Sequence, residues 1–145
     1  MDPLVSIVTP SYNQAKYLER TMNSVLDQDY PNLEYIVIDG GSTDGSVEII
    51  KEYSDRISYW ESKKDKGQTE AINKGFSRAN GQIFAWINSD DTYQPGAIRE
   101  MVAFMIENPD IGMVYGDCNF IDADDNIIGK GAYVNTTLME DISDT

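Results

Sequence analysis

The stretch "LEYIVIDGGS", residues 33–42, contains the repeating unit of the predicted fold. Its apolar and β-branched residues predict a buried strand over Glu34–Asp39, which ends in a Gly-Gly loop. Asp44 then opens a predicted helix whose apolar residues recur at helical spacing. A strand, a loop and a helix in this order are typical of α/β folds.

The same alternation extends along the chain in both directions. The other predicted strands cover Leu4–Pro10, Ile57–Ser62 (nearer an edge), 82–88, 111–122 and 127–133. The other predicted helices cover Ala15–Leu26 and Gly67–Ala79, and one more begins at Pro95. The fold class is therefore predicted as α/β, with a mostly parallel central sheet and helices on both faces. A length of 145 residues favours a single domain over 1–145.

The charge of the chain restricts its ligands. A formal net charge of −14 leaves no basic footprint for nucleic acid, and an anionic ligand would need a divalent cation to bridge it to this protein. The sequence has no histidine, which excludes histidine bases and histidine-built zinc sites. Any metal is therefore expected to be a hard cation with oxygen ligands, Mg²⁺ or Mn²⁺.

The sequence contains no targeting or membrane-spanning segment that we recognise. No signal peptide is recognisable at the first residues, and the longest apolar run, Met101–Ile106, is too short to span a bilayer. The single cysteine, Cys118, allows no internal disulfide. We expect a cytoplasmic protein, with attachment to the inner face of a membrane through other residues left open.

Polar residues follow four of the predicted strands. The segments are Pro10–Asn13, Asp39–Asp44, Asp65–Gln68 and Asn88–Asp91. Parallel strands end at one edge of a sheet, and in such folds ligands bind at that edge. Each segment alone also has a structural interpretation, as a helix cap (Asn13; Thr43 or Asp44; Asp91 or Thr92) or as a turn (Asp65 with Gly67).

Together the four segments favour a ligand site. Asp39 has no helix to cap nearby, and the adjacent charges of Asp90 and Asp91 would repel each other unless they were solvated or neutralised. A divalent cation that also holds a diphosphate would neutralise them.

The glycine motifs of P-loop and dinucleotide-binding proteins and the GxSxG elbow are absent from the sequence. A receiver-like phosphoacceptor domain is disfavoured because the late strand "MVYGDC" is not followed by a lysine.

The segments "VSIVTPSYNQAKYLERTMNSVLDQDYPNLEYIVIDGGSTDGS" and "DKGQTEAINKGFSRANGQIFAWINSDD" resemble the nucleotide-binding half of the family-2 glycosyltransferases. The resemblance extends from about Leu4 to Asp117 and implies the Rossmann-like GT-A fold. It also implies transfer of a sugar from a nucleoside-diphosphate sugar, with UDP as the expected nucleotide, to a hydroxyl of a saccharide or lipid-linked acceptor. The expected context is polysaccharide or glycoconjugate biosynthesis.

The resemblance implies a role for each matching residue. The residues implied to line the nucleoside pocket are Pro10, Tyr12 and Asn13. Asp39 would accept a hydrogen bond from the base, and Asp65 or the backbone around Gly67 would touch the base or ribose. The segment Asn88-Ser89-Asp90 stands at the Asp-x-Asp motif, which implies ribose contact for Asn88, metal ligation for Asp90 and a place near the sugar for Asp91. Two departures are Asn88, where the motif has an acid, and Ile72, where many relatives have arginine.

The catalytic base is not identifiable. In an inverting enzyme of this kind an aspartate of the acceptor-binding half deprotonates the acceptor, and that half lies well beyond the metal motif. Glu140-Asp141 comes too early and reads as a polar tail, while Asp122, Asp124 and Asp125 read as a hairpin turn. We therefore expect a chain truncated before the acceptor half, with an exposed apolar patch that favours a homo-oligomer. The alternative is a non-catalytic nucleotide-sugar-binding domain that needs a partner.

Overall fold

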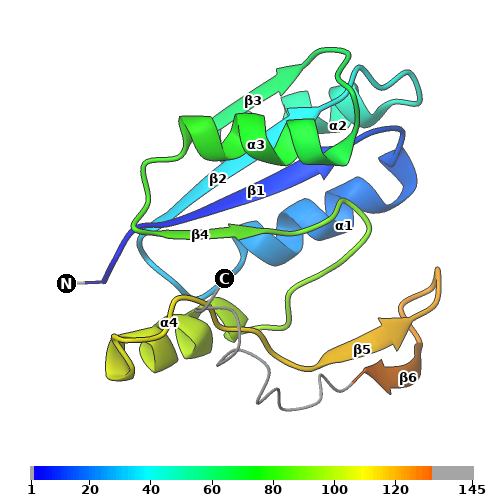
Figure 1. Ribbon diagram of the computed structural model, residues 1–145. Coiled ribbons are helices and arrows are strands. Elements are labelled where there is room, and N and C mark those ends of the chain that lie inside the picture. The colour runs from blue at the N-terminus through cyan, green and yellow to red at the C-terminus, as the bar shows by residue number, and fades with distance from the viewer. Residues whose placement is uncertain (1, 132–145) are drawn as a thin grey trace, which may run out of the picture. The chain divides into compact units, whose positions relative to one another are not determined.

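The computed structural model describes residues 2–131, which divide into two compact units with a boundary between Glu100 and Met101. The first unit contains a four-stranded sheet, and the second contains a two-stranded hairpin (Figure 1). Within residues 2–131, none of the helices has the length and apolar character that a membrane crossing requires. A single domain over 1–145 stays a prediction.

The sheet of the first unit is parallel throughout, as predicted. Its strands, in the spatial order β3-β2-β1-β4, are β1 (Val5–Ser11), β2 (Leu33–Asp39), β3 (Tyr59–Ser62) and β4 (Ile83–Trp86). The central strand β1 is buried along its whole length, because helices cover both faces of the sheet. The predicted place of the third strand at an edge is confirmed.

The helices are α1 (Ala15–Leu26), α2 (Ser46–Glu52), α3 (Gln68–Arg78) and α4 (Ala97–Glu107). The predicted bounds of α1 are confirmed, whereas α2 and α4 each begin two residues later than predicted. The reason is the same in both cases: the residue before each helix is a glycine with positive φ, 99° at Gly45 and 81° at Gly96. A left-handed residue cannot form part of an α-helix.

Side chains on the two faces of the sheet alternate along each strand. Val8, Ile36 and Ile38 form a buried cluster with Ala71 of α3, which covers one face, while α1 and α2 lie on the opposite face (Figure 1). Helix α3 comes very close to β1 at Gly75, where an added Cβ would lie 2.4 Å from Val8 Cγ1. A glycine is therefore needed at this crossing.

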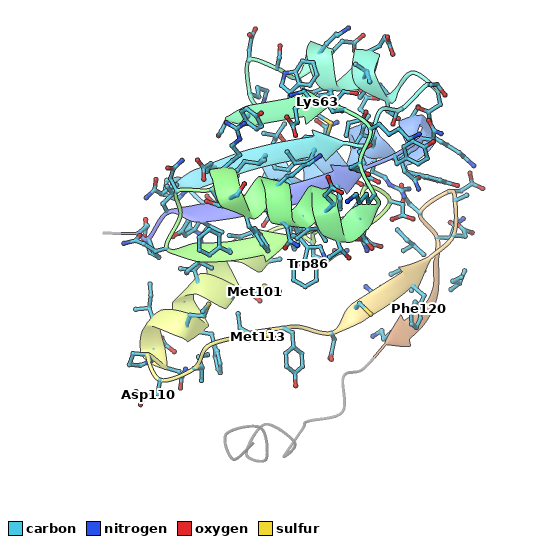
Figure 2. All side chains as sticks on the ribbon, turned by 45° about the horizontal axis from the view of Figure 1, so that its top comes forward. Lys63, Trp86, Met101, Asp110, Met113 and Phe120 are labelled. Atoms are coloured by element: carbon cyan, nitrogen blue, oxygen red, sulfur yellow. The ribbon has the colours of Figure 1, made fainter. Side chains whose placement is uncertain are left out.

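The outer strand β4 carries two half-exposed aromatic residues. Phe84 is 51% exposed and Trp86, labelled in Figure 2, is 54% exposed. The Phe84 ring also packs edge-to-face against Phe76 of α3, with 5.6 Å between the ring centroids. These two side chains are exposed apolar surface. The predicted apolar patch and the homo-oligomer stay predictions.

The second unit contains an antiparallel hairpin of β5 (Cys118–Ile121) and β6 (Ile127–Gly131). The predicted turn between them is confirmed: the Asp122 carboxylate accepts the backbone N–H groups of Asp124 and Asn126, at 2.9 and 3.0 Å. The predicted strand over 111–122 is wrong for 111–117, which has no strand partner within residues 2–131. Two glycines, Gly112 and Gly116, lie in that segment and weaken any strand there.

Candidate functional site

The carboxyl ends of the four parallel strands meet at one edge of the first sheet (Figure 1). In the register of the strands, Ser11 lies opposite Asp39, and Asp39 lies opposite Ser62. We call the four loops that follow these strands the rim: loop 1 (12–14), loop 2 (40–45), loop 3 (63–67) and loop 4 (87–96). Every residue that the sequence analysis proposed for the site lies in the rim or at the end of a strand that leads into it.

Asp39 is fully buried at the centre of the rim. Its Oδ2 accepts the backbone N–H groups of Gly41 (3.0 Å) and Ser42 (2.8 Å) and the hydroxyl of Ser62 (2.6 Å). Its Oδ1 accepts the hydroxyl of Ser42 at 2.5 Å. Asp39 caps no helix, but its carboxylate has a local structural use that the sequence did not reveal: it organises loop 2. Its contact with a base stays a prediction.

Loop 2 and the first residue of α2 supply the cap of helix α1. The backbone N–H of Ala15 donates to Asp44 Oδ2 at 2.9 Å, and that of Gln14 donates to Ser46 Oγ at 3.1 Å. The predicted cap of α1 by Asn13 is wrong, since no side chain of loop 1 caps this helix. These two amides already have acceptors, so neither is open to a phosphate.

The pKa of Asp44 reflects this capping. Burial by itself would raise the pKa of the carboxyl, but hydrogen bonds from the Ser46 hydroxyl and from the backbone N–H groups of Ala15 and Ser46 outweigh it. The pKa therefore lies below its ordinary value. Asp44 is an anion that joins loop 2 to α1.

Loop 1 has an unusual backbone. Asn13 adopts a φ of 52°, in the left-handed region that few residues other than glycine occupy. Its Oδ1 accepts the backbone N–H of Thr43 at 2.9 Å. The preceding Tyr12 is 63% exposed, whereas Pro10, at the end of β1, is buried. Loop 1 thus presents an aromatic ring to solvent beside a fixed polar loop.

Ser11, which stands between Pro10 and Tyr12 in the chain, carries a buried hydroxyl. Ser11 is 4% exposed, and its Oγ has no hydrogen-bond partner within residues 2–131. In the strand register it is the neighbour of Asp39. Buried polar groups nearly always have a partner, so this donor marks the centre of the rim as a polar site.

Loop 3 contacts loop 2 through Asp65. Its Oδ1 accepts the backbone N–H of Gly67 at 2.9 Å, which agrees with the interpretation as a turn. The same carboxylate lies against Gly40, where an added Cβ would be 3.1 Å from Oδ1. Lys63, labelled in Figure 2, begins this loop and pairs with Glu61 at 3.5 Å. Asp65 and Gly67 are therefore placed beside the loop that Asp39 holds.

Loop 4 is joined to α3 and α1. The Gln68 side chain donates to Asn88 Oδ1 at 2.5 Å, and Asn88 Nδ2 donates to Asp91 Oδ2 at 3.1 Å. The Thr21 hydroxyl donates to the backbone carbonyl of Asp91 at 2.7 Å. Ser89 is buried, at 6% exposure. All four loops are therefore tied to neighbouring segments by hydrogen bonds or close packing.

Asp90 and Asp91 are both exposed. Their charges are therefore solvated, and the doubled carboxylate does not need a cation for stability. The Asp90 side chain makes no hydrogen bond or ion pair within residues 2–131, which leaves its oxygens open to a ligand.

A divalent cation would fit Asp90 but would need further ligands. Within residues 2–131 no three acidic or cysteine side chains lie close enough together to hold a metal. Mg²⁺ is commonly bound by one or two carboxylates together with the phosphates of a substrate. An exposed, unpartnered carboxylate at the rim meets that requirement, and Asp90 as metal ligand stays a prediction.

The sequence analysis missed three side chains that organise the rim: Ser42, Ser62 and Gln68. Each makes a hydrogen bond to a candidate residue, Asp39 or Asn88. Their positions were visible, because Ser62 ends a predicted strand and Ser42 and Gln68 follow glycines. The partners of Ser62 and Gln68 were not visible, because a sequence does not show which segments touch, whereas Ser42 contacts a residue of its own segment.

Comparison with known proteins gives one consistent result. The family model described as glycosyl transferase family 2 matches residues 6–133. TuaG of Bacillus subtilis, named for a glycosyltransferase role in teichuronic acid biosynthesis, is 40% identical over 108 residues, which cover 72% of this chain and 43% of TuaG. An uncharacterized glycosyltransferase of Rickettsia typhi is 37% identical over 122 residues, covering 83% of this chain and 38% of the relative. The chain thus spans less than half the length of these relatives.

Solved structures show the same fold. TarS 1-349 of S. aureus in complex with UDP-GlcNAc has a TM-score of 0.67 at 26% identity, covering 73% of this chain and 32% of the 1-349 chain. The mannosyltransferase PcManGT of Pyrobaculum calidifontis, in complex with GDP-Man and Mn²⁺, has a TM-score of 0.65 at 23% identity, covering 81% of this chain and 35% of PcManGT. The first unit therefore has the GT-A architecture.

Proposed function

The chain belongs to glycosyltransferase family 2, and from this we propose that its rim binds the sugar donor of a glycosyltransferase, a nucleoside-diphosphate sugar with UDP as the nucleotide. The reaction is transfer of the sugar to a hydroxyl of a saccharide or lipid-linked acceptor, in polysaccharide or glycoconjugate biosynthesis. TarS, a structural relative, was crystallised with UDP-GlcNAc, which supports this choice of nucleotide. A cytoplasmic location, at or near the inner face of a membrane, stays a prediction.

One observation supports the proposal most strongly: the four strand-end segments form one polar rim around Asp39, and exposed side chains that are available to a ligand lie in its loops. The exposed ring of Tyr12 and the unpartnered carboxylate of Asp90 lie in loops that hydrogen bonds hold in place. A rigid support with exposed polar and aromatic groups is what recognition of a nucleotide requires. Ser11 adds a buried donor with no partner within residues 2–131.

Each rim residue has a role in this proposal. Tyr12 packs against the nucleoside, and Asp39 accepts a hydrogen bond from the base. Asp90 holds a divalent cation on the diphosphate, and Asp91 lies near the sugar. The remaining contacts to base, ribose and phosphate come from Pro10, Asn13, Asp65, Gly67, Asn88 and Ser89.

The chemistry is an inverting displacement, in which the acceptor oxygen bonds to the anomeric carbon as the nucleoside diphosphate leaves. When bound, the cation supplies positive charge to the leaving diphosphate. The rim residues contribute by binding and orienting the sugar donor, so that the anomeric carbon faces the acceptor. The base that takes the proton from the acceptor is not assigned, and Glu140-Asp141 lie outside the described residues.

Calorimetry tests this function. UDP is titrated into the wild-type protein with Mn²⁺, and then into Asp39→Ala, Asp90→Ala and the control Asp55→Ala, which removes an exposed acid outside the rim. We expect the first two substitutions to weaken binding by about tenfold or more, because each removes a charged contact. The control should bind as the wild type does. Equal heats in all four proteins, or none in the wild type, would refute the proposal.

A further inference from the structure

The hydroxyl of Ser42 makes two hydrogen bonds that join separate parts of the rim. It accepts the backbone N–H of Asn13 in loop 1, at 2.8 Å, and donates to Asp39 Oδ1, at 2.5 Å. A serine hydroxyl can donate and accept at the same time, which a backbone N–H cannot do. One side chain of loop 2 therefore connects loop 1 with the buried carboxylate.

Loop 1 depends on this connection. Asn13 is held in its left-handed conformation from both sides, by Ser42 at its backbone N–H and by Thr43 at its side-chain Oδ1. Such a conformation persists only where the surroundings hold it. Because Tyr12 precedes Asn13, the direction in which the exposed tyrosine ring points depends on the same two contacts.

Asp39 is anchored independently of this hydroxyl. Its Oδ2 keeps the backbone N–H groups of Gly41 and Ser42 and the hydroxyl of Ser62 whatever the side chain at position 42 is. Loss of the Ser42 hydroxyl thus leaves the carboxylate in the sheet, and loop 2 stays tied to α1 through Asp44 and Ser46. What is lost is the link between the carboxylate and loop 1.

We propose that Ser42 is a positioning residue for base recognition, which fixes the Tyr12–Asn13 loop relative to Asp39 so that the exposed Tyr12 ring is held where it meets the nucleobase. The inference rests on the proposed function, since it assumes that the rim binds a nucleotide. Neither the family match nor the sequence analysis assigns a role to Ser42.

The test compares two ligands that differ only in the base. UDP and ribose 5-diphosphate are titrated with Mn²⁺ into the wild type, Ser42→Ala and Ser42→Thr. The control is Ser54→Ala, which removes a hydroxyl that donates to the nearby carbonyl of Lys51. We expect Ser42→Ala to bind UDP about tenfold or more weakly, because the Tyr12–Asn13 loop is no longer preorganised for the base, with less than about a twofold change for ribose 5-diphosphate.

The rescue variant and the control sharpen the result. Ser42→Thr keeps the hydroxyl and should recover UDP binding to within about threefold of the wild type, and Ser54→Ala should match the wild type. Equal losses for both ligands would make Ser42 a general structural residue and overturn the inference, as would a Ser42→Ala protein that binds UDP normally. If the wild type binds no UDP, the proposed function fails and this inference fails with it.

Discussion

The two ends of the central sheet each hold a carboxylate within a network of hydrogen bonds. At the amino end, Glu34 accepts the hydroxyl of Ser6 and both the backbone N–H and the side-chain amide of Asn80, at 2.8 and 2.7 Å. At the carboxyl end, Asp39 accepts four hydrogen bonds from Gly41, Ser42 and Ser62. By hydrogen bonding alone, the two carboxylates look alike.

What differs is the set of groups beside each carboxylate. The partners of Glu34 belong to β1 and to the turn before β4, where the N–H of Gly81 also bonds Ser6 Oγ at 2.8 Å. Asp39 instead supports a loop that contacts a left-handed asparagine next to an exposed tyrosine. A carboxylate whose hydrogen bonds are all formed therefore does not by itself identify a binding site. The binding site is identified by the exposed and unpartnered groups that such a carboxylate holds in place.

The largest expected effect is that of Asp39→Asn. The amide removes the negative charge that four donors surround and replaces one acceptor oxygen with an NH₂ group, so the free energy of unfolding should fall by about 2 kcal/mol. UDP affinity should also fall by about tenfold or more, because the charged acceptor for the base is lost. Urea denaturation and calorimetry measure the two effects. If Asp39→Asn were as stable as the wild type and bound UDP equally well, the carboxyl end of the sheet would not differ from the amino end in its role in binding.

At the amino end, Gly81→Ala should reduce stability without affecting binding. An added Cβ would lie 2.5 Å from Ser6 Oγ and 2.8 Å from the carbonyl of Leu4, so the strands must shift, at a cost of about 2 kcal/mol. UDP affinity should stay within about twofold of wild type after correction for the unfolded fraction. The matched control is Gly112→Ala, where an added Cβ meets no atom within 4 Å. If Gly81→Ala lost UDP affinity and Gly112→Ala did not, the amino end of the sheet would also contribute to binding, contrary to our expectation.

The smallest expected effect is a pH dependence that Glu34 provides. Burial would raise the pKa of Glu34, but hydrogen bonds from the Ser6 hydroxyl and from Asn80 outweigh it and hold the pKa below its ordinary value. A carboxyl with a lowered folded pKa stabilises the fold above its unfolded pKa, and this contribution is lost as pH falls through the folded pKa.

Stability of the wild type should therefore decline on acidification below about pH 5, and Glu34→Gln should decline less steeply while starting about 1 kcal/mol lower at neutral pH. Urea denaturation at pH 7 and at acidic pH measures both. Parallel pH curves for the two proteins would show that Glu34 is not the titrating group.

Much of the fold could be predicted because its signals are local. The bounds of α1 and the end of β2 at Asp39 follow from the spacing of apolar residues and from the glycines that interrupt it. The starts of α2 and α4 were misplaced by two residues, since the backbone angles of Gly45 and Gly96 cannot be deduced from their identity. The strand predicted over 111–117 was wrong for another reason: a strand requires a second strand to pair with, and the spacing of apolar residues does not show whether one exists.

For the site, the sequence by itself determined which residue types stand at the ends of the strands, and the parallel order of those strands brought them to one edge. Only the tertiary structure decided how they are used: Asp39 accepts the hydroxyl of Ser62, Asp44 caps helix α1, which begins 29 residues before it, and Gln68 reaches Asn88. These hydrogen bonds join segments that are distant in the chain. Local propensities fix each segment separately, whereas the choice of partner depends on how the packed helices and strands place the loops.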